Sequence, residues 1–426
     1  MTNARPKADS SAPWRSSRGR GMEEDASAIP PRITNCIAVL GSKLKILSVG
    51  ALIILLGVAS AKGQAALAQK PLMAEDVFKN VQVLKGISVD EFMGTMGFIA
   101  ASLSMNCIDC HSTASAGDVA RFADDTPLKQ TTRKMILMVK NINTGNFGGV
   151  REVTCYTCHR GSDRPKVTPS LSEQYDTPPP EDPDEFDFAG ETQRGPSAAQ
   201  VFDKYIQALG GAGRVSKLVS FIAKGTYQGF DTESENNPTV PLEVFAKAPN
   251  QRTLIVHLST GDSIRSYDGR AGWTTSAGTL LPLPMLALTG GNLEGAKLDA
   301  QLSFPSEINK MLTGWRVGST DIADTAVEVV QGTTAARFPV KLYFDKKSGL
   351  LVRSVRYTNT PIGLNPTRVD YSDYRVVAGV KMPFHWVVTW TDGRSSIQLK
   401  EVQPNAQIDP AKFAKPVTAP PKSATR

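Results

Sequence analysis

Two copies of one five-residue pattern hold four of the five cysteines in this chain of 426 residues. They read Cys107-Ile-Asp-Cys110-His111 and Cys155-Tyr-Thr-Cys158-His159, and they include two of the four histidines. Two thiols three positions apart lie on one helical turn, where both can form thioether bonds to a single haem, and the next histidine can bind its iron. The spacing therefore predicts two covalently attached c-type haems, each with its own iron.

A structural zinc site is the other chemistry that two C-x-x-C pairs allow. Such a site uses four cysteines and leaves His111 and His159 without a role. Zinc ribbons are also mostly intracellular, whereas the N-terminal residues of this chain have the features of an export signal. We therefore favour haem over zinc, and the iron content of the protein distinguishes the two.

The N-terminal residues follow the order of a secretory signal. Lys43 and Lys45 precede the apolar run 46–58, and small residues follow at 59–61 and 66–68. A basic segment, an apolar segment and small residues in that order are typical of a signal peptide. The run is shorter than the roughly 20 residues of a membrane-spanning helix. We therefore predict export to the periplasm.

The export signal occupies residues 43–69 in this interpretation. A cleaved signal peptide is the first expectation, and an uncleaved anchor of residues 46–61 in the inner membrane is the alternative. Residues 1–42 form a disordered N-terminal extension, and translation starts at Met1 or at Met22.

The overall charge does not indicate nucleic-acid binding. The 48 basic and 41 acidic residues leave a net charge of +7, and no long block of Lys and Arg occurs. The length exceeds that of one compact domain, and the 41% hydrophobic content is enough for more than one core. We therefore expect two folded domains.

Composition divides the rest of the chain into four parts. Residues 70–168 have the pattern of helices and loops and contain both motifs, which predicts a mainly α dihaem cytochrome c module. Residues 169–195 are acidic and rich in proline, which predicts an extended linker. Residues 196–415 form a β-rich α+β domain whose antiparallel sheet is strongly curved, like a half-barrel. Residues 416–426 are a disordered tail.

The second domain begins with a helix at 198–209 that ends at Gly210 and Gly211. Short β-branched or aromatic runs follow, with turn signals such as Asp268-Gly269 between them. A helical insert at about 281–312 interrupts the series. The expected strands are 219–227, 242–247, 253–258, 263–267, 326–330, 340–344, 350–357 and 386–390.

A methionine-bearing helix precedes each cysteine motif. Ser88 has the pattern of an N-cap before a helix that places Met96 on its apolar face. Thr126-Pro127 begins the second such helix. On spacing alone Met96 is a core residue, and periodicity does not choose between Met135 and Met138. The repeat indicates a duplicated unit whose haems lie close together. The apolar stripe of the second helix consists of Met135, Met138, Val139 and Ile142.

Three longer segments surround the motifs: Val83-Leu-Lys-Gly-Ile-Ser-Val-Asp-Glu-Phe-Met-Gly-Thr-Met96, Arg133-Lys-Met-Ile-Leu-Met-Val-Lys-Asn-Ile-Asn143 and Val153-Thr-Cys-Tyr-Thr-Cys-His-Arg-Gly161. These segments resemble the cytochrome subunit of purple-bacterial photosynthetic reaction centres. The resemblance covers roughly residues 70–168 and is to one of the two dihaem halves of that four-haem subunit.

In that family each haem has the histidine of its motif on one side and usually a methionine from the preceding helix on the other. The resemblance thus implies Met96 opposite His111, and Met135 opposite His159 with Met138 as the alternate. Such ligation raises the reduction potential. It also implies an electron carrier, with no catalytic residues, whose donor or acceptor is a redox protein or a quinol-oxidising membrane complex.

The chain departs from the family pattern in two respects. It has two motifs where the complete subunit carries four haems, and its loop 143–153 lacks the histidine that in the family ligates a haem of the other half. Residues 196–415 also contain nothing that looks like reaction-centre machinery.

The second domain resembles, at the level of pattern, the curved half-barrels of periplasmic lipoprotein carriers such as LolA. The segments that carry this resemblance are Ser266-Tyr-Asp-Gly-Arg-Ala-Gly-Trp273 and Val340-Lys-Leu-Tyr-Phe-Asp-Lys-Lys-Ser-Gly-Leu-Leu-Val352. It implies a concave face that can hold a lipid or a quinone. His257 and His385 lie in expected strands, and we assign them no site.

Three functions are therefore weighed. The favoured one is a dihaem cytochrome that transfers single electrons between two six-coordinate haems. The second is a haem-based redox enzyme or sensor with one open iron site. The third is a lipid-binding or quinone-binding periplasmic protein with an accessory haem module.

Overall fold

The computed structural model describes residues 70–111, 119–176, 182–188, 195–229, 232, 239–275 and 283–417. The chain divides into two compact units, residues 1–65 and residues 66–426, and every described residue lies in the second. The expected signal or anchor at 43–69 and the extension at 1–42 lie outside the described residues. Within the described part, no helix is both long enough and apolar enough to span a membrane.

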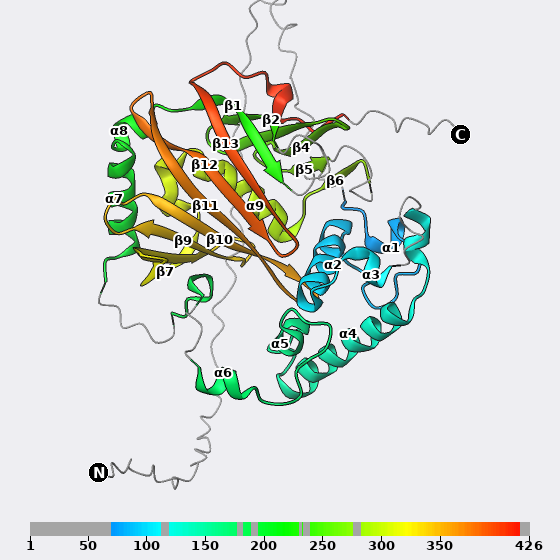
Figure 1. Ribbon diagram of the computed structural model, residues 1–426. Helices are drawn as coiled ribbons and strands as arrows, with labels where there is room; N and C mark the ends of the chain where they lie inside the picture. The colour runs from blue at the N-terminus through cyan, green and yellow to red at the C-terminus, as the bar shows by residue number, and fades with distance from the viewer. Residues whose placement is uncertain are drawn as a thin grey trace, which may run out of the picture. The chain divides into compact units, whose positions relative to one another are not determined.

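The N-terminal part of the described chain is helical (Figure 1). Its elements are α1 (Ala74–Val77), α2 (Val89–Leu103), α3 (Cys107–Cys110), η2 (Val119–Ala123), α4 (Pro127–Asn146), α5 (Cys155–His159), α6 (Leu171–Tyr175) and η3 (Pro183–Glu185), where η marks a 3-10 turn.

The two long helices begin where the sequence predicts. The Ser88 hydroxyl accepts a hydrogen bond from the backbone N–H of Glu91 at the start of α2. The Thr126 hydroxyl accepts one from Lys129 N–H at the start of α4, with Pro127 in the first turn. Both caps satisfy backbone donors that a helix end leaves unpaired.

The apolar stripe predicted for α4 is wrong in part. Ile136, Val139 and Asn143 are the buried residues of this helix, while Met135 and Met138 are exposed. Ile136 belongs to a buried cluster with Phe98 and Ile99 of α2, so the inner face of α4 is rotated away from the two methionines.

The C-terminal part consists of a large sheet with helices packed on it. Its elements are α7 (Ala198–Leu209), α8 (Ala212–Val215), β1 (Ser220–Gly229), β2 (Val240–Lys247), β3 (Gln251–Leu258), β4 (Gly261–Tyr267), β5 (Gly272–Thr275), β6 (Met285–Ala287), α9 (Gly290–Leu302), η4 (Pro305–Lys310), β7 (Thr313–Ile322), β8 (Thr325–Thr333), β9 (Pro339–Asp345), β10 (Leu351–Thr360), β11 (Gly363–Val377), β12 (Val380–Trp390), β13 (Gly393–Pro404) and η5 (Pro410–Phe413).

Thirteen strands of the described chain pair into one antiparallel sheet in the order β6-β5-β4-β3-β2-β1-β13-β12-β11-β10-β9-β8-β7. The chain therefore starts at the centre with β1, proceeds to one edge, crosses to the other edge through α9, and returns to the centre with β13. Helix α9 lies across one face of the sheet (Figure 1). The predicted class, a helical region plus an antiparallel, curved and unclosed sheet, is confirmed.

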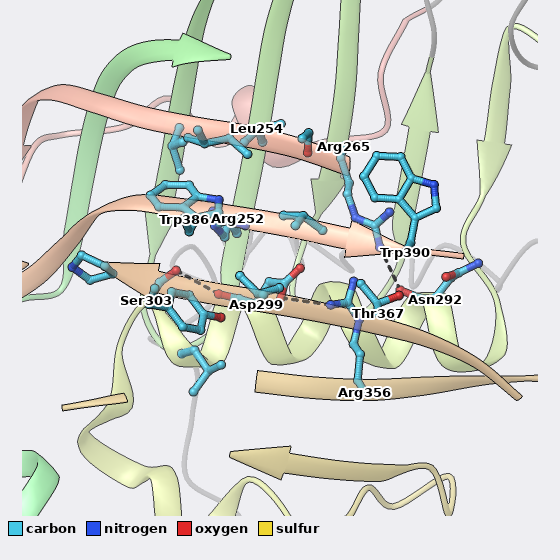
Figure 2. A pocket seen from close by; sticks show the side chains of 18 of the residues that line it. Arg252, Leu254, Arg265, Asn292, Asp299, Ser303, Arg356, Thr367, Trp386 and Trp390 are labelled. Atoms are coloured by element: carbon cyan, nitrogen blue, oxygen red, sulfur yellow. Dashed lines mark hydrogen bonds and ion pairs between the residues drawn. The ribbon is translucent and has the colours of Figure 1, made fainter. Parts of the chain in front are cut away.

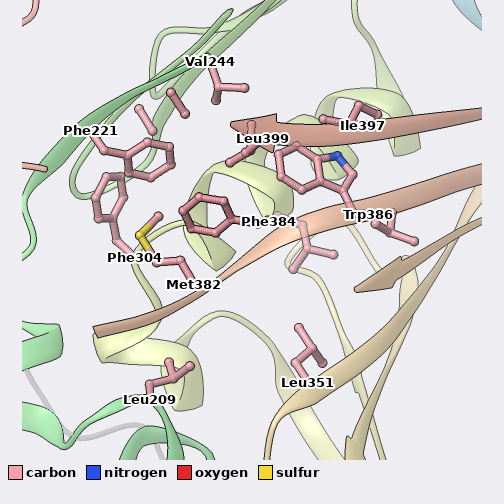
Figure 3. Close-up of a cluster of buried hydrophobic side chains, with 14 of the residues drawn as sticks. Leu209, Phe221, Val244, Phe304, Leu351, Met382, Phe384, Trp386, Ile397 and Leu399 are labelled. Atoms are coloured by element: carbon pink, nitrogen blue, oxygen red, sulfur yellow. The ribbon is translucent and has the colours of Figure 1, made fainter. Parts of the chain in front are cut away.

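The main core fills the space between the sheet and its helices (Figure 3). Phe221 and Phe304 pack at a centroid distance of 5.7 Å, and the α7 residue Tyr205 packs 5.1 Å from Phe344. These aromatic side chains are nearly fully buried, and burial of this kind contributes roughly 1.5–3 kcal/mol for each large apolar side chain. The core therefore holds α7, η4 and the strands as one body.

The expected linker is held against the sheet at residues 182–188. The Asp184 carboxylate pairs with Arg353 Nη1 at 2.9 Å and with Arg368 Nη1 at 3.1 Å. Phe186 and Phe188 cover a buried cluster that includes Val327 and Val329. Composition predicts an extended chain here. It does not reveal the ion pairs of Asp184 or the packing of Phe186 and Phe188 against the sheet.

Helix α2 is fixed to the β-rich part by its polar groups. The Asp90 carboxylate accepts hydrogen bonds from the backbone N–H of Thr289 at 2.8 Å and from Asn292 Nδ2 at 3.0 Å. Asn365 Nδ2 donates to the Gly94 carbonyl at 2.6 Å. The helix that carries Met96 is therefore held by α9 and β11.

The turn between β10 and β11 completes the core of the helical part. Ile362 is 3% exposed and packs in the cluster of Phe98 and Ile99. Arg151, from the loop before α5, donates from Nη1 to the carbonyls of Thr360 at 2.7 Å and Gly363 at 2.8 Å. The two parts of the described chain thus share one buried contact region.

A pH-dependent stability follows from Asp90. Burial raises the pKa of this carboxyl group, although hydrogen bonds from Thr289 and Asn292 and the charge of Arg265 oppose the shift. A raised folded-state pKa stabilises the native state below the unfolded pKa of about 3.9, and this contribution is lost as pH rises through the folded pKa. Denaturant unfolding should show the wild type losing stability relative to Asp90→Asn as pH rises from about 4.

The exposed Asp321→Asn on β7 is the matched control for the removal of one carboxyl group. A pH-independent difference between the wild type and Asp90→Asn would contradict the interpretation.

Candidate haem-binding site

The first motif forms its own helical turn, α3, because its flanking residues cap it. Asn106 Oδ1 accepts from the backbone N–H of Ile108 and Asp109, and the Asp109 carboxylate accepts from Asn106 N–H at 2.8 Å. This reciprocal capping box needs no other part of the protein. The Cys107 and Cys110 thiols are therefore presented from one turn, as a thioether-bound haem requires.

His111 is oriented by a backbone carbonyl. Its Nδ1 lies 3.1 Å from the Phe122 oxygen, and its ring lies 5.0 Å from the Phe122 ring. Because a carbonyl only accepts, Nδ1 carries the proton and Nε2 keeps its lone pair for a metal. Burial lowers the pKa of His111, which favours the neutral, metal-binding form.

The loop that supplies this carbonyl is tied to the motif. Lys129 Nζ donates to the carbonyls of Phe122 at 2.9 Å and Asp124 at 2.6 Å. The Thr126 hydroxyl donates to the Cys110 carbonyl at 2.7 Å. These bonds connect the start of α4 to the first motif.

The second motif repeats the arrangement on α5. Thr154 and Thr157 form its capping box, and His159 Nδ1 lies 2.9 Å from the Ser162 carbonyl, which again leaves Nε2 for a metal. Gly161 has a φ of +78° and donates its N–H to the Ser102 carbonyl of α2 at 3.0 Å. The left-handed turn after the motif therefore ties α5 to α2.

Asn143 positions the chain that leads into the second motif. Its Nδ2 donates to the Val153 carbonyl at 2.7 Å, and its Oδ1 accepts from the N–H groups of Glu152 and Val153 at 3.0 and 2.9 Å. The side chain is 7% exposed, so these bonds form away from bulk water. The sequence analysis did not predict this role of Asn143. The signal that could have indicated it is an asparagine on the inner face of a helix, close to the end of that helix.

The predicted methionine ligands occupy different environments. Met96 is half-buried and packs on the cluster of Phe98 and Ile99, which Cys155 also contacts. Met135 and Met138 are 37% and 42% exposed on α4. In the part of the chain that the structure describes, no hydrogen bond joins Met96 to His111 or Met135 to His159.

Large apolar side chains surround both motifs on the surface. Half of the exposed large apolar residues among those described lie between positions 108 and 156. The exposed apolar residues in this segment are Ile108, Leu128, Met135, Leu137, Met138, Phe147, Val150 and Tyr156. A small helical module with this much exposed apolar surface could bind a flat apolar group, such as the ring of a haem.

A groove lies between the first motif and the residues that follow the second. It is lined by residues 103–105 at and after the end of α2, by Asp109 of α3, by Leu128 of α4 and by residues 161–163 after α5. No disulfide joins the four motif cysteines, which lie on two separate C-x-x-C-H turns. Among the described residues no three Cys, His, Asp or Glu side chains converge on a point that could hold a metal ion.

The histidines that received no site have hydrogen-bond partners in the sheet. His257 Nδ1 lies 2.8 Å from Asp262 Oδ1, and His385 bonds to the hydroxyls of Ser372 and Ser396. Both histidines lie in strands, as expected, and their partners lie on neighbouring strands of the sheet.

A second site candidate is a cavity of about 580 Å³ on the face of the sheet that α9 covers. Arg252, Arg265, Arg356 and Asp299 are among its lining residues (Figure 2). Apolar side chains of the central strands, such as Val244 and Leu399, also line it. Its volume lies within the range of small-molecule sites, roughly 300–1,000 Å³.

Comparisons with known proteins support the cytochrome resemblance. The model of the family described as photosynthetic reaction centre cytochrome C subunit matches residues 57–181. The reaction centre cytochrome c subunit of Thermochromatium tepidum is 39% identical over 97 residues, which cover 22% of this chain and 23% of that protein. The corresponding subunit of Roseobacter denitrificans is 35% identical over 101 residues, which cover 22% and 26%. The chain spans about a quarter of the length of the curated relatives it matches.

Solved structures match the chain at low sequence identity. A LolA superfamily protein from Nitrosomonas europaea is 12% identical and covers 52% of this chain and 99% of its own, with a TM-score of 0.35. A DUF1329 family protein from Desulfovibrio piger is 10% identical and covers 52% and 98%, with a TM-score of 0.36.

Replacement of Asn143 tests how the second motif is held. Asn143→Ala leaves two N–H groups and one carbonyl without their partner, so we expect the free energy of unfolding to fall by on the order of 2–4 kcal/mol. Haem attachment at Cys155 and Cys158 should fall with it. The control is Asn146→Ala on the same helix, whose side chain bonds only to the Ile142 carbonyl at an exposed position. Equal effects of the two substitutions on denaturant unfolding and haem content would contradict the assigned role.

Proposed function

We propose that this protein is a dihaem c-type cytochrome that transfers single electrons. The observation that carries the proposal is the repeated turn in which C-x-x-C thiols share a helical turn and the next histidine bonds through Nδ1 to a backbone carbonyl. A histidine in that tautomer presents Nε2 to a metal, and the carbonyl bonded to Nδ1 fixes the ring. The match to reaction centre cytochrome subunits over residues 57–181 supports the same function.

Each residue has a defined role in the proposal. Cys107 and Cys110 hold one haem through thioether bonds, and Cys155 and Cys158 hold the other. His111 and His159 bind the two irons. When bound, the haems supply the one-electron chemistry, and the protein orients them and excludes water.

The second axial ligands follow from the family resemblance. Met96 would bind the first iron together with His111, and Met135, with Met138 as the alternate, would bind the second iron together with His159. The exposed position of Met135 and Met138 on α4 leaves both thioethers accessible to a bound haem. Met/His ligation would give potentials high enough for a quinol-oxidising complex or a redox protein as partner. Export by residues 43–69 would place the exchange in the periplasm.

A second candidate function concerns the cavity of the β-rich part. Its size and mainly apolar lining support the binding of a lipid or a quinone. Such binding is compatible with electron transfer, because the haem motifs and the cavity use different side chains.

Cysteine replacement tests the number of haems. The purified full chain should contain two haems by pyridine haemochrome assay, and Cys107→Ala/Cys110→Ala and Cys155→Ala/Cys158→Ala should each contain one. Loss of zinc instead of haem in these variants, or a single haem in the wild type, would refute the dihaem proposal.

Replacement of Met96 tests axial ligation at an identified haem. In a Cys155→Ala/Cys158→Ala background, which retains the first haem, Met96→Ala should abolish the charge-transfer band of methionine-ligated ferric haem and lower the midpoint potential. Met93→Ala is the control, because Met93 lies one turn earlier on α2 and lines the cavity. An unchanged spectrum would show that Met96 does not ligate the first haem and would favour an open iron site there.

A further inference from the structure

Three arginine side chains line the cavity. Arg252 lies on β3, Arg265 on β4 and Arg356 on β10, and all three line the cavity with Asp299 of α9 (Figure 2). Buried charges are costly unless they are paired. The partners of each guanidinium group therefore indicate the charge of a ligand that the cavity could bind.

Strand register places Arg252 and Arg265 on the same face of the sheet. Leu254, two residues after Arg252 on β3, pairs directly with Arg265 on β4. Side chains two positions apart on a strand share a face, and diagonal neighbours across strands lie roughly 7–8 Å apart, within reach of long side chains. Both guanidinium groups can therefore contact one small anionic group.

Of these three arginines, Arg356 forms an ion pair with a carboxylate of the protein. Its Nη1 lies 3.8 Å from Asp299 Oδ1. Gly295 of α9 allows this close approach, because a Cβ atom at that position would lie 2.2 Å from Arg356 Nε. Asp299 is thus engaged by Arg356, and Figure 2 shows this pair within the lining.

Arg252 and Arg265 have weaker partners. Arg265 Nη2 donates to the Asn292 carbonyl at 3.3 Å. Arg252 Nε is a buried donor without a hydrogen-bond partner, and its guanidinium lies 5.7 Å from the centre of the Trp386 ring. Within the described residues neither side chain forms an ion pair with a carboxylate. Burial, followed by the charge of Arg356, lowers the pKa of Arg265, although the charges of Asp299 and Asp90 oppose the shift.

Other acidic groups at the cavity form no ion pair with Arg252 or Arg265 among the described residues. The Asp90 carboxylate, whose charge acts on Arg265, is hydrogen-bonded to Thr289 and Asn292 instead. Asp392 lies on the exposed turn between β12 and β13. A bound anion could therefore form the ion pairs that these two arginines lack.

The other lining is apolar. Phe221, Val244, Phe304, Met382 and Leu399 line the cavity, and each is less than 9% exposed (Figure 3). A hydrocarbon chain placed there gains roughly 0.8 kcal/mol for each buried CH₂ group. The cavity thus combines a cationic end with an apolar lining.

We propose that the cavity binds an amphiphile with one hydrocarbon chain and an anionic head group, a carboxylate or a phosphate, held by Arg252 and Arg265. The inference rests on the second proposed function, ligand binding in this cavity, and it narrows the ligand from a lipid or quinone to an anionic one. A neutral quinone would leave both guanidinium groups without counter-charge.

Calorimetric titration of the full haem-loaded chain tests the inference. The probes are oleate, oleyl phosphate and the neutral oleyl alcohol, each below its micelle concentration. Oleate or oleyl phosphate should bind at least tenfold more tightly than oleyl alcohol, and the stronger of the two identifies the head group. Arg252→Gln or Arg265→Gln should weaken the anionic ligand by about tenfold to a hundredfold and leave the alcohol within about twofold, because a charge-assisted hydrogen bond is lost. Lys400→Gln removes an exposed charge on β13 from a residue that does not line the cavity, and it should change the affinity for neither ligand.

The outcomes separate the inference from the function on which it rests. Equal affinity for oleate, oleyl phosphate and oleyl alcohol in the wild type overturns the anionic head group but leaves a ligand-binding cavity, and this comparison needs no variant to fold. Tight binding of a neutral quinone without binding of oleate or oleyl phosphate would also overturn the anionic head group and leave a ligand-binding cavity. Failure of every probe overturns both. The haem count is independent of each of these results.

Discussion

The hydrogen bonds from His111 Nδ1 to the Phe122 carbonyl and from His159 Nδ1 to the Ser162 carbonyl are the constraint on which the haem region depends. Each fixes a tautomer and a ring orientation, and each needs a carbonyl delivered by a loop that other contacts hold. Lys129 and Thr126 hold the first loop, and Gly161 ties the second to α2. The two histidines are therefore prepared for a metal by the backbone around them.

The β-rich part constrains the same helices from the other side. Asp90, Gly94 and Gly97 of α2 border the cavity, while Met96 and Phe98 pack in the cluster that Ile362 completes. One helix thus contributes to the cavity and to the haem region. The chain order of the sheet explains why α2 lies beside the cavity. The chain crosses from one sheet edge to the other through α9, and the start of α9 meets α2 at Thr289.

Local signals in the sequence predicted much of this arrangement. The caps at Ser88 and Thr126, the helix Ala198–Leu209 and most strands follow from residue types alone. Five strands, β5, β6, β7, β11 and β13, were missed; β11 contains Gly363 and Pro366, and β13 is largely polar, so neither has the expected apolar pattern. The roles of Asn143 and Arg151 and the cluster of cavity arginines depend on residues brought together from distant segments, which spacing cannot show. Cysteine spacing identified the two C-x-x-C-H motifs because each motif lies within five residues.

The central claim is that two haems each exchange one electron. A spectroelectrochemical titration of the purified full chain tests it most directly, because it counts electrons and reports the coordination of each iron. The account predicts two electrons taken up per chain, with both haems low-spin and six-coordinate in the oxidised and reduced forms. Uptake of one electron or none, or a high-spin haem at either motif, would contradict it.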